Sequence, residues 1–285
     1  MPFHEQQLQF VVWVSQLRGP VLDLLFRFFG LFDSIEAVSL IAAAVTVGFS
    51  YRWGIRLSYL IVISYAVNYW LKIIVGWPRP SQEIPGLGML DFSNNGFPSG
   101  GAQMSFVFGA LLIYYGKSRL TTIIGVVYIL LISFSRIYLG VHFPGDVLGG
   151  WTVGFILILL FIRFIEPSEE FLKKQGYWVA FTLSQALPIL YMILFPEPLL
   201  DTIPSLAFGL GACLSLKYHL YLPPPKTLLI AAFRVLVALV GIFLIYLSWP
   251  KDWFSPLEMY LIPLWGSLAA SPVCKLLMNL RKRSR

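Results

Sequence analysis

The chain reads SRIYLGVHFPGD from Ser135 to Asp146, and this polar stretch joins two apolar runs, residues 120–135 and 146–165. Apolar runs of this kind approach the ~20 residues that a helix needs to cross a bilayer. Ionisable side chains at the ends of such runs are costly to bury in lipid, so they mark a functional site by default. We therefore expect a helical membrane protein whose chemistry lies at the ends of its spans.

The composition of the whole chain agrees with this fold class. Of its 285 residues, 58% are hydrophobic and 12% are charged, which is about half the usual charged fraction of ~25%. These values exclude an ordinary soluble domain and an intrinsically disordered chain. The two cysteines lie within apolar stretches and support neither a disulfide framework nor a zinc site.

The hydrophobic pattern predicts an all-α, polytopic bundle of about nine transmembrane helices. The apolar runs cover residues 35–50, 57–76, 101–116, 120–135, 146–165, 178–195, 203–217, 227–248 and 257–278. Before them, charges interrupt the apolar residues of segment 3–31, which predicts two interfacial amphipathic helices broken near Gly19-Pro20. We expect three regions: an interfacial segment (1–33), a core that carries the polar motifs (34–165), and further spans with a basic tail (166–285).

The basic residues predict how the chain is oriented in the membrane. With the N-terminus outside, one side receives most of the loop cations: Arg52, Arg56, Lys117, Arg119, Arg163, Lys173, Lys174, Lys217, Lys226 and the tail 281–285. By the positive-inside rule this side is the cytoplasm, which places the C-terminus there and the polar motifs on the extracytoplasmic face. Because topology accounts for the net charge of +7, we expect no nucleic-acid partner.

Two polar segments precede the quoted stretch on the same side of the membrane. In KIIVGWPRP, from Lys72 to Pro80, the prolines stop the helix and turn the chain, so Lys72 and Arg79 can converge on one anion. Snorkelling toward the headgroups is the alternative for these cations. In GFPSGG, residues 96–101, small residues open a helix and present N–H groups suited to phosphate, although this is also an ordinary turn.

The third segment is the quoted stretch itself. His142 and Asp146 lie four residues apart beside a helix start, so the carboxylate can fix the tautomer of the imidazole and raise its nucleophilicity. Arg136 adds a planar fork of donors that suits phosphate oxygens. A metal pair is the alternative, but the other histidines, His4 and His219, lie outside this cluster, so we expect no metal.

Together the three segments resemble the signature of the type 2 phosphatidic acid phosphatase (lipid phosphate phosphatase) superfamily. The matching residues run as Lys-x6-Arg-Pro from Lys72, Pro-Ser-Gly from Pro98, and Ser-Arg-x5-His-x3-Asp from Ser135. The topology is most similar to the membrane-embedded branch with the sphingosine-phosphate, dolichyl-diphosphate and glucose-6-phosphate phosphatases. The resemblance implies hydrolysis of a lipid-like phosphomonoester or diphosphate in a membrane, without a metal or an organic cofactor.

The resemblance also implies a role for each matching residue. His142 would attack phosphorus and form a phosphohistidine, while Asp146 orients its ring. The phosphate oxygens would be bound by Lys72, Arg79, Ser99, Gly100, Arg136 and the backbone N–H groups from Ser99 to Gly101.

Gly101 departs from the family pattern, in which this position is a histidine that protonates the leaving group. A glycine cannot transfer a proton, and Gln103 nearby can donate a hydrogen bond but is no acid. Three interpretations follow. The chain is a variant of an ordinary phosphatase made to trap its substrate, or a natural diphosphatase or phosphotransferase that works without the acid, or a non-catalytic relative that binds or transports lipid phosphates.

Overall fold

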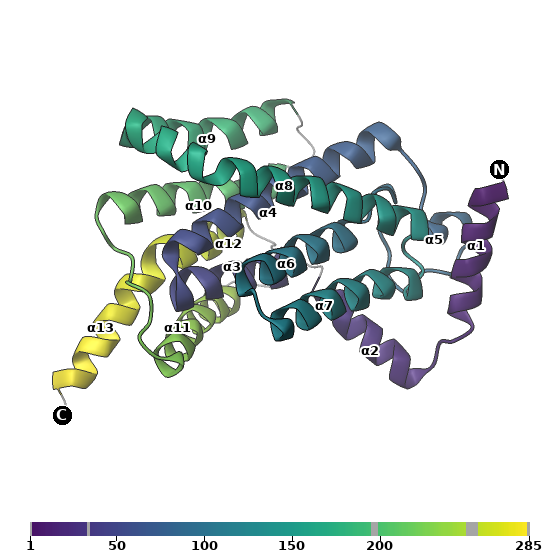
Figure 1. Ribbon diagram of the computed structural model, residues 1–285, viewed down its shortest axis with the longest axis horizontal. Coiled ribbons are helices and arrows are strands. Elements are labelled where there is room, and N and C mark those ends of the chain that lie inside the picture. Colours follow the sequence, from purple (N-terminus) through teal and green to yellow (C-terminus); the bar gives the residue numbers. More distant parts are fainter. Residues whose placement is uncertain (1, 33–34, 195–198, 249–255, 284–285) are drawn as a thin grey trace. The chain divides into compact units, whose positions relative to one another are not determined.

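The computed structural model describes residues 2–32, 35–194, 199–248 and 256–283, and all regular structure within these ranges is helical (Figure 1). The elements in order are α1 (Pro2–Ser15), α2 (Pro20–Leu31), α3 (Ile35–Ala43), the π-helix η1 (Ala44–Phe49), α4 (Tyr51–Val75), α5 (Pro80–Glu83), α6 (Gly100–Gly116), α7 (Arg119–Tyr138), α8 (Pro144–Gln175), α9 (Tyr177–Leu194), α10 (Leu199–Lys217), α11 (Leu228–Leu247), α12 (Pro256–Leu264), the π-helix η2 (Trp265–Ala269) and α13 (Ala270–Arg283). The predicted all-α fold is confirmed.

The helices form two compact units. Unit 1 comprises Met1–Val38 and Leu60–Phe164, and unit 2 comprises Ser39–Tyr59 and Ile165–Arg285. All three polar segments belong to unit 1. The division of the chain into an interfacial segment, a core and additional spans stays a prediction.

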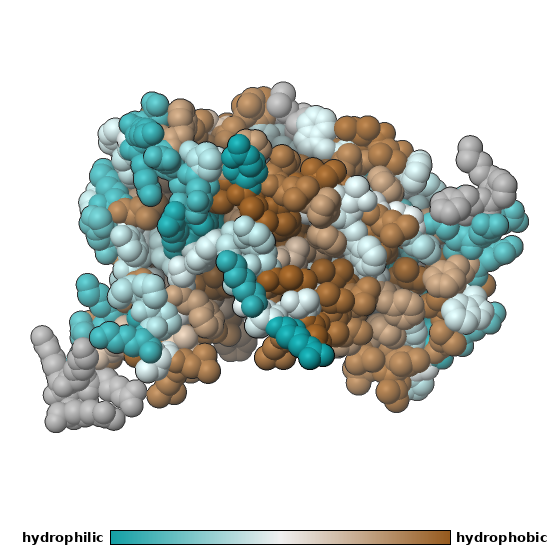
Figure 2. Space-filling view, viewed as in Figure 1, coloured by the Kyte–Doolittle hydropathy of each residue, from teal (hydrophilic) through white to brown (hydrophobic). Residues whose placement is uncertain are grey.

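The length and composition of the helices suit a bilayer. Among the residues that the structure describes, five segments are long and apolar enough to cross a membrane. They cover Tyr51–Glu83, Arg119–Tyr138, Pro144–Gln175, Leu228–Leu247 and Met259–Asn279. Shorter apolar helices cover Ala37–Phe49, Tyr177–Ile193 and Ile203–Lys217, so the number of spans stays a prediction. Apolar side chains such as Leu120 and Ile123 on α7 and Phe155 on α8 are exposed, and Figure 2 shows much apolar surface on the face in view.

Local sequence explains why the polar segments lie at helix ends. Gly76, with a φ of +66°, follows the last residue of α4 and adopts the left-handed conformation that glycine tolerates best. Ser99 caps α6, because its Oγ accepts a hydrogen bond from the Ala102 N–H at 3.4 Å. Pro144 is the first residue of α8, where a proline costs no hydrogen bond. The predicted placement of the motifs is confirmed.

The N-terminal helices end and begin where the sequence predicts. Gly19 is the N-cap of α2 and Pro20 its first residue, which breaks the pair α1–α2. Val11 and Val14 of α1 are fully buried in one hydrophobic cluster with Leu139. Both helices pack against α7 (Figure 1).

Unit 2 contains an ion-pair cluster of its own. The Nε of Arg56 donates to Glu169 Oε1 at 2.6 Å, and the Nε of Arg52 donates to Glu169 Oε2 at 3.0 Å. Arg56 is only 4% exposed, so its buried charge is paired with a carboxylate that is partly exposed. Both arginines belong to the predicted cytoplasmic set, and Arg285 of the predicted basic tail lies outside the described residues.

Candidate active site

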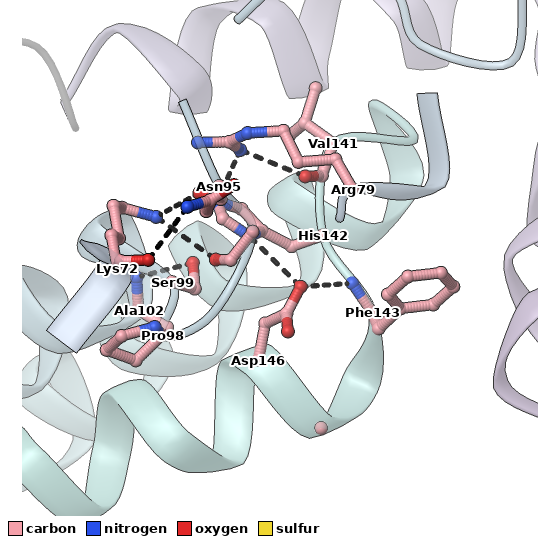
Figure 3. Close-up of polar contacts among 12 residues, drawn as sticks. Lys72, Arg79, Asn95, Pro98, Ser99, Ala102, Val141, His142, Phe143 and Asp146 are labelled. Carbon is pink, nitrogen blue, oxygen red and sulfur yellow. Dashed lines mark hydrogen bonds and ion pairs between the residues drawn. The ribbon is translucent and has the colours of Figure 1, made fainter. Parts of the chain in front are cut away.

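His142 lies in the loop between α7 and α8, residues 139–143, which we call the α7–α8 loop. Its ring is flanked by Arg79 on one side and Asp146 on the other (Figure 3). Arg79 Nη1 lies 3.0 Å from His142 Nε2, and His142 Nδ1 lies 3.3 Å from Asp146 Oδ2. Because a guanidinium only donates hydrogen bonds, Nε2 must be the acceptor and the ring proton must be on Nδ1. This tautomer leaves the lone pair of Nε2 directed away from Asp146.

Asp146 joins the second and third polar segments. Its Oδ2 also accepts a hydrogen bond from the Phe143 N–H at 2.9 Å, and its backbone oxygen accepts one from the Ser99 N–H at 2.9 Å. The residue is only 2% exposed. The Phe143 N–H therefore fixes the carboxylate that faces the imidazole, and the Ser99 N–H fixes the backbone of the same residue, as the predicted orienting role requires.

Arg79 contacts three parts of unit 1. Its Nε donates to the Asn94 carbonyl oxygen at 2.8 Å, its Nη2 to Asn94 Oδ1 at 2.5 Å, and its Nη1 to the Val141 carbonyl oxygen at 3.0 Å. The guanidinium carbon lies 4.5 Å from the centre of the Phe92 ring, in a cation–π contact. These hydrogen bonds to oxygens of Asn94 and Val141 hold the guanidinium of Arg79 beside His142.

Lys72 approaches the same place from the last turns of α4. Its Nζ donates to the carbonyl oxygens of Asn95 at 2.7 Å and Gly96 at 3.1 Å, and Asn95 Nδ2 donates back to the Lys72 oxygen at 2.8 Å. The sequence pattern predicted the convergence of Lys72 and Arg79, and both point to the segment around Asn94 and Asn95. Sequence reasoning missed these two asparagines, whose only signal is that they directly precede the Gly-Phe-Pro-Ser segment.

The electrostatic environment keeps His142 neutral. Burial lowers the pKa of His142 well below its ordinary value of 6.5, and the positive charges of Arg79, Lys72 and Arg136 lower it further. The side chain is 5% exposed. A neutral imidazole is the nucleophilic form, so the site provides a nucleophile among cations that could stabilise an anionic substrate.

Ser99 is fully buried, and both its hydroxyl and its N–H group have partners within unit 1. The predicted use of the Ser99 N–H for phosphate does not fit this geometry, because that group donates to the Asp146 carbonyl oxygen. Gly100 and Gly101, the first two residues of α6, carry the backbone N–H groups that we still expect to face an anion.

Arg136 is buried, and its position differs from that of the other two cations. Its Nε donates to Ser135 Oγ at 3.3 Å, and a Cβ built on Gly30 would lie 2.5 Å from its Nη2. One arm of the guanidinium therefore faces α2, while its charge still acts on His142. Direct binding of phosphate by Arg136 stays a prediction.

The side chains around Gly101 provide no replacement acid. Gln103 is fully buried, and its Nε2 donates to the carbonyl oxygen and the Oγ of Ser64, each at 2.8 Å. Its Oε1 accepts from Asn68 Nδ2 at 2.9 Å. Gln103 is therefore a structural link between α4 and α6, and both ends of its amide have partners on α4.

These observations define a class: a polytopic helical membrane protein in which a buried His–Asp pair lies among Lys and Arg side chains at helix ends. Within the described ranges, no three His, Cys, Asp or Glu side chains gather in a way that could hold a metal ion. Such a cluster suits the binding of a tetrahedral oxyanion beside a nitrogen nucleophile.

Comparison with known proteins shows a family similarity in part of the chain. Residues 53–170, which carry all three motifs, match the PAP2 superfamily. In fold, the chain is similar to the transmembrane PAP2 type phosphatidylglycerolphosphate phosphatase from Bacillus subtilis, with a TM-score of 0.51 and 23% identity over 58% of this chain and 87% of that one. Together with the apolar helices, these matches identify an integral membrane protein.

Curated relatives resemble parts of the chain. Lipid A 4'-phosphatase of Bacteroides thetaiotaomicron is 30% identical over 37% of this chain and 53% of its own length. Undecaprenyl-diphosphatase of Sulfolobus acidocaldarius is 28% identical over 42% of this chain and 61% of its own length. The probable sphingosine-1-phosphate phosphatase of Dictyostelium discoideum is 25% identical over 78% of this chain and 60% of its own length. The chain thus spans between half and two thirds of each of these relatives.

Proposed function

We propose that this protein is a membrane phosphatase that removes phosphate from a lipid-like substrate through a phosphohistidine on His142. The observation that carries the proposal is the pairing of His142 with both Asp146 and Arg79. A protein that only binds an anion needs cations, but it needs neither a neutral nucleophile nor a carboxylate that orients it. Two of the relatives act on a lipid phosphate or a lipid diphosphate according to their names.

The reaction proceeds in two displacements. In the first, the lone pair of His142 Nε2 attacks phosphorus, the N–P bond forms, and the P–O bond to the leaving group breaks with its electron pair remaining on that oxygen. Asp146 stabilises the positive charge that develops on the ring. In the second, water attacks phosphorus, the N–P bond breaks, and inorganic phosphate leaves while the imidazole becomes neutral again. No step requires a metal or an organic cofactor.

Lys72 and Arg79 stabilise the charge on the equatorial oxygens of the transferred phosphoryl group. In the structure their hydrogen bonds go to the oxygens of Asn94, Asn95 and Gly96. Phosphate oxygens have the same acceptor character with more charge, so a bound substrate replaces these contacts by stronger ones. Arg136 adds positive charge from the side of α2.

Gly101 determines which leaving groups the site can expel. The alkoxide of a phosphomonoester is strongly basic, and the loss of a general acid typically costs ~10²- to 10⁴-fold in rate. The leaving group of a diphosphate is itself a phosphate, which departs without a proton. We therefore propose that a lipid diphosphate is the better substrate of this chain, and that a monoester requires a histidine at position 101.

The sidedness of the reaction follows from the charge distribution. Lys72, Arg79 and His142 lie at one end of their helices, and the loop cations predict that this end is extracytoplasmic and that the C-terminus is cytoplasmic. The substrate would then reach the site from the outer leaflet or from the aqueous phase beside it. The membrane and the amphiphilic phosphate are the only partners that the proposal requires.

The test is release of inorganic phosphate by the purified protein in phospholipid vesicles. The substrates are a prenyl diphosphate, a sphingoid monophosphate and glucose 6-phosphate, and His142→Ala is the blank. We expect the chain to cleave the diphosphate, and Gly101→His to raise the rate on a monoester by ~10²-fold or more. The trapping interpretation is supported if only Gly101→His turns over. Binding without turnover in both proteins would contradict the proposal and favour transport or lipid binding.

A further inference from the structure

The N-terminal helical pair, residues 2–31, contacts the two helix ends that flank the α7–α8 loop, at Tyr138 and at Gly145. From these contacts we infer that the pair holds the loop in its catalytic geometry, with Gln7 and Arg18 as positioning residues. The inference rests on the proposed function, since it assigns a role within the same reaction.

Gln7 completes the start of α8 from a distant part of the chain. The residue before Pro144 is Phe143, whose side chain has no polar atom to cap the helix. Asp146, the third residue of α8, binds the Phe143 N–H as in half of a capping box. Gln7 supplies the side-chain acceptor that Phe143 lacks, because its Oε1 accepts a hydrogen bond from the N–H of Gly145, the second residue of α8, at 2.6 Å. Gln7 therefore satisfies a partly buried donor in the turn that carries Asp146.

Arg18 performs the corresponding task at the end of α7. Its Nη2 donates to the carbonyl oxygens of Tyr138 at 3.0 Å and Leu87 at 2.7 Å. Tyr138 is the last residue of α7, and a cation at that end of a helix is stabilised by the helix dipole. Leu87 belongs to the segment between α5 and α6, so one guanidinium joins three parts of unit 1 at the position where the α7–α8 loop begins.

Helix α1 meets the α7–α8 loop on the side away from Lys72 and Ser99. Figure 3 shows the Phe143 ring pointing away from Lys72 and Ser99. That ring meets His4 of α1, with the ring centres 4.9 Å apart. Val14 of α1 is fully buried in the same cluster as Phe143. This placement excludes contact with the transferred phosphoryl group through these residues and leaves a positioning role.

Position matters because the nucleophile must be aligned with phosphorus, and misplacement by about 1 Å can cost ~10²-fold in rate. The hydrogen bonds of Gln7 and Arg18 fix the backbone at Gly145 and Tyr138, on either side of the loop. Loss of either contact lets the loop move and lets water reach His142.

The experiment compares Gln7→Leu and Arg18→Met with the unmodified chain in phospholipid vesicles. The matched controls are Gln6→Leu, which changes an exposed side chain on the same helix, and Gln7→Glu, which keeps an acceptor oxygen. We expect kcat to fall about tenfold in Gln7→Leu and Arg18→Met, as for the loss of one buried hydrogen bond, with KM nearly unchanged. Gln6→Leu and Gln7→Glu should retain activity.

A second readout separates positioning from mere stability. Water admitted to the loop raises the pKa of His142 toward 6.5, so the acid limb of the kcat/KM profile should move to higher pH in Gln7→Leu. The groups that face this ring are Asp146, Arg79, Lys72 and Arg136, and both proteins retain them. A Gln7→Leu profile identical to that of the unmodified chain would overturn the inference, as would equal losses in Gln6→Leu.

A third measurement does not depend on turnover. Hydrogen–deuterium exchange of residues 139–147 without substrate should be faster in Gln7→Leu than in Gln6→Leu. Unchanged exchange overturns the inference whatever the activity. Faster exchange in a protein that hydrolyses no phosphate on any substrate supports the inference about the loop and contradicts the proposed function instead.

Discussion

Replacement of Asp146 by asparagine should slow the attack of His142 on phosphorus without removing the side chain. Asp146 Oδ2 accepts from both His142 Nδ1, at 3.3 Å, and the Phe143 N–H, at 2.9 Å. In Asp146→Asn an amide oxygen at the same position can accept both hydrogen bonds, and Arg79 Nη1, a donor 3.0 Å from His142 Nε2, keeps the ring proton on Nδ1. The substitution therefore removes the negative charge beside the ring and keeps the tautomer.

The size of the effect follows from the lost charge. The imidazolium that forms when Nε2 attacks phosphorus then faces a neutral amide in place of a carboxylate. A hydrogen bond to a charged group contributes about 1.5 to 3 kcal/mol. We therefore expect kcat to fall by ~10- to 10²-fold, which is about 1.4 to 2.7 kcal/mol in activation free energy.

The assay is phosphate release under single-turnover conditions, with acid-stable and acid-labile phosphate separated to detect the phosphohistidine. Asp91→Asn is the matched control, because it removes a carboxylate from an exposed position in the same unit. Thermal unfolding of both variants shows whether the fold is retained. Asp146→Asn with an unchanged rate, in a folded protein, would refute the argument from the lost charge.

Three further predictions follow from the geometry. Burial and the nearby cations lower the pKa of His142 well below 6.5, so the ring stays neutral as the pH falls through 6.5. The value of kcat/KM should therefore be constant near pH 6.5 and decline only at more acidic pH. A decline that begins at or above pH 6.5 would contradict this prediction. Gly140, at a φ of +71°, lies against the Leu87 carbonyl oxygen, so Gly140→Ala should lower the free energy of unfolding by about 2 kcal/mol. Gly86→Ala, at a φ of +81° with open space around it, should cost less in the same unfolding experiment. Gly30→Ala would place a Cβ 2.5 Å from Arg136 Nη2 and should raise the KM for phosphate substrates, whereas Gly19→Ala, where nothing lies nearby, should leave KM unchanged.

The sequence was sufficient to place the motifs at helix ends, because the signals for these ends are local. Gly76 and Pro78 end α4, Ser99 caps α6, and Pro144 starts α8, each within a turn of the residue that it positions. Since Lys72 and His142 occur beside such ends, the pattern of charges could be assembled into one site before the structure was known.

The contacts that complete the site could not be predicted in the same way. Gln7 and Gly145 are 138 residues apart. A glutamine on an amphipathic helix carries no sequence signal for a hydrogen-bond partner at such a separation. Asn94 could not be predicted for a different reason. An asparagine in a loop usually indicates a turn, whereas here its side chain binds Arg79. Side-chain partners of this kind depend on the tertiary packing of several helices and not on periodicity.

The hydrogen bonds that fix the start of α6 do not depend on the side chain at position 101. The start of α6 is fixed by Ser99, whose Oγ caps Ala102, and by Gln103, which binds Ser64 and Asn68. None of these hydrogen bonds uses a side chain at position 101. A change between histidine and glycine there therefore alters the supply of a proton to the leaving group while the hydrogen bonds that build the site remain. For that reason a gain of monoester hydrolysis in Gly101→His would report on leaving-group chemistry and not on a repaired fold.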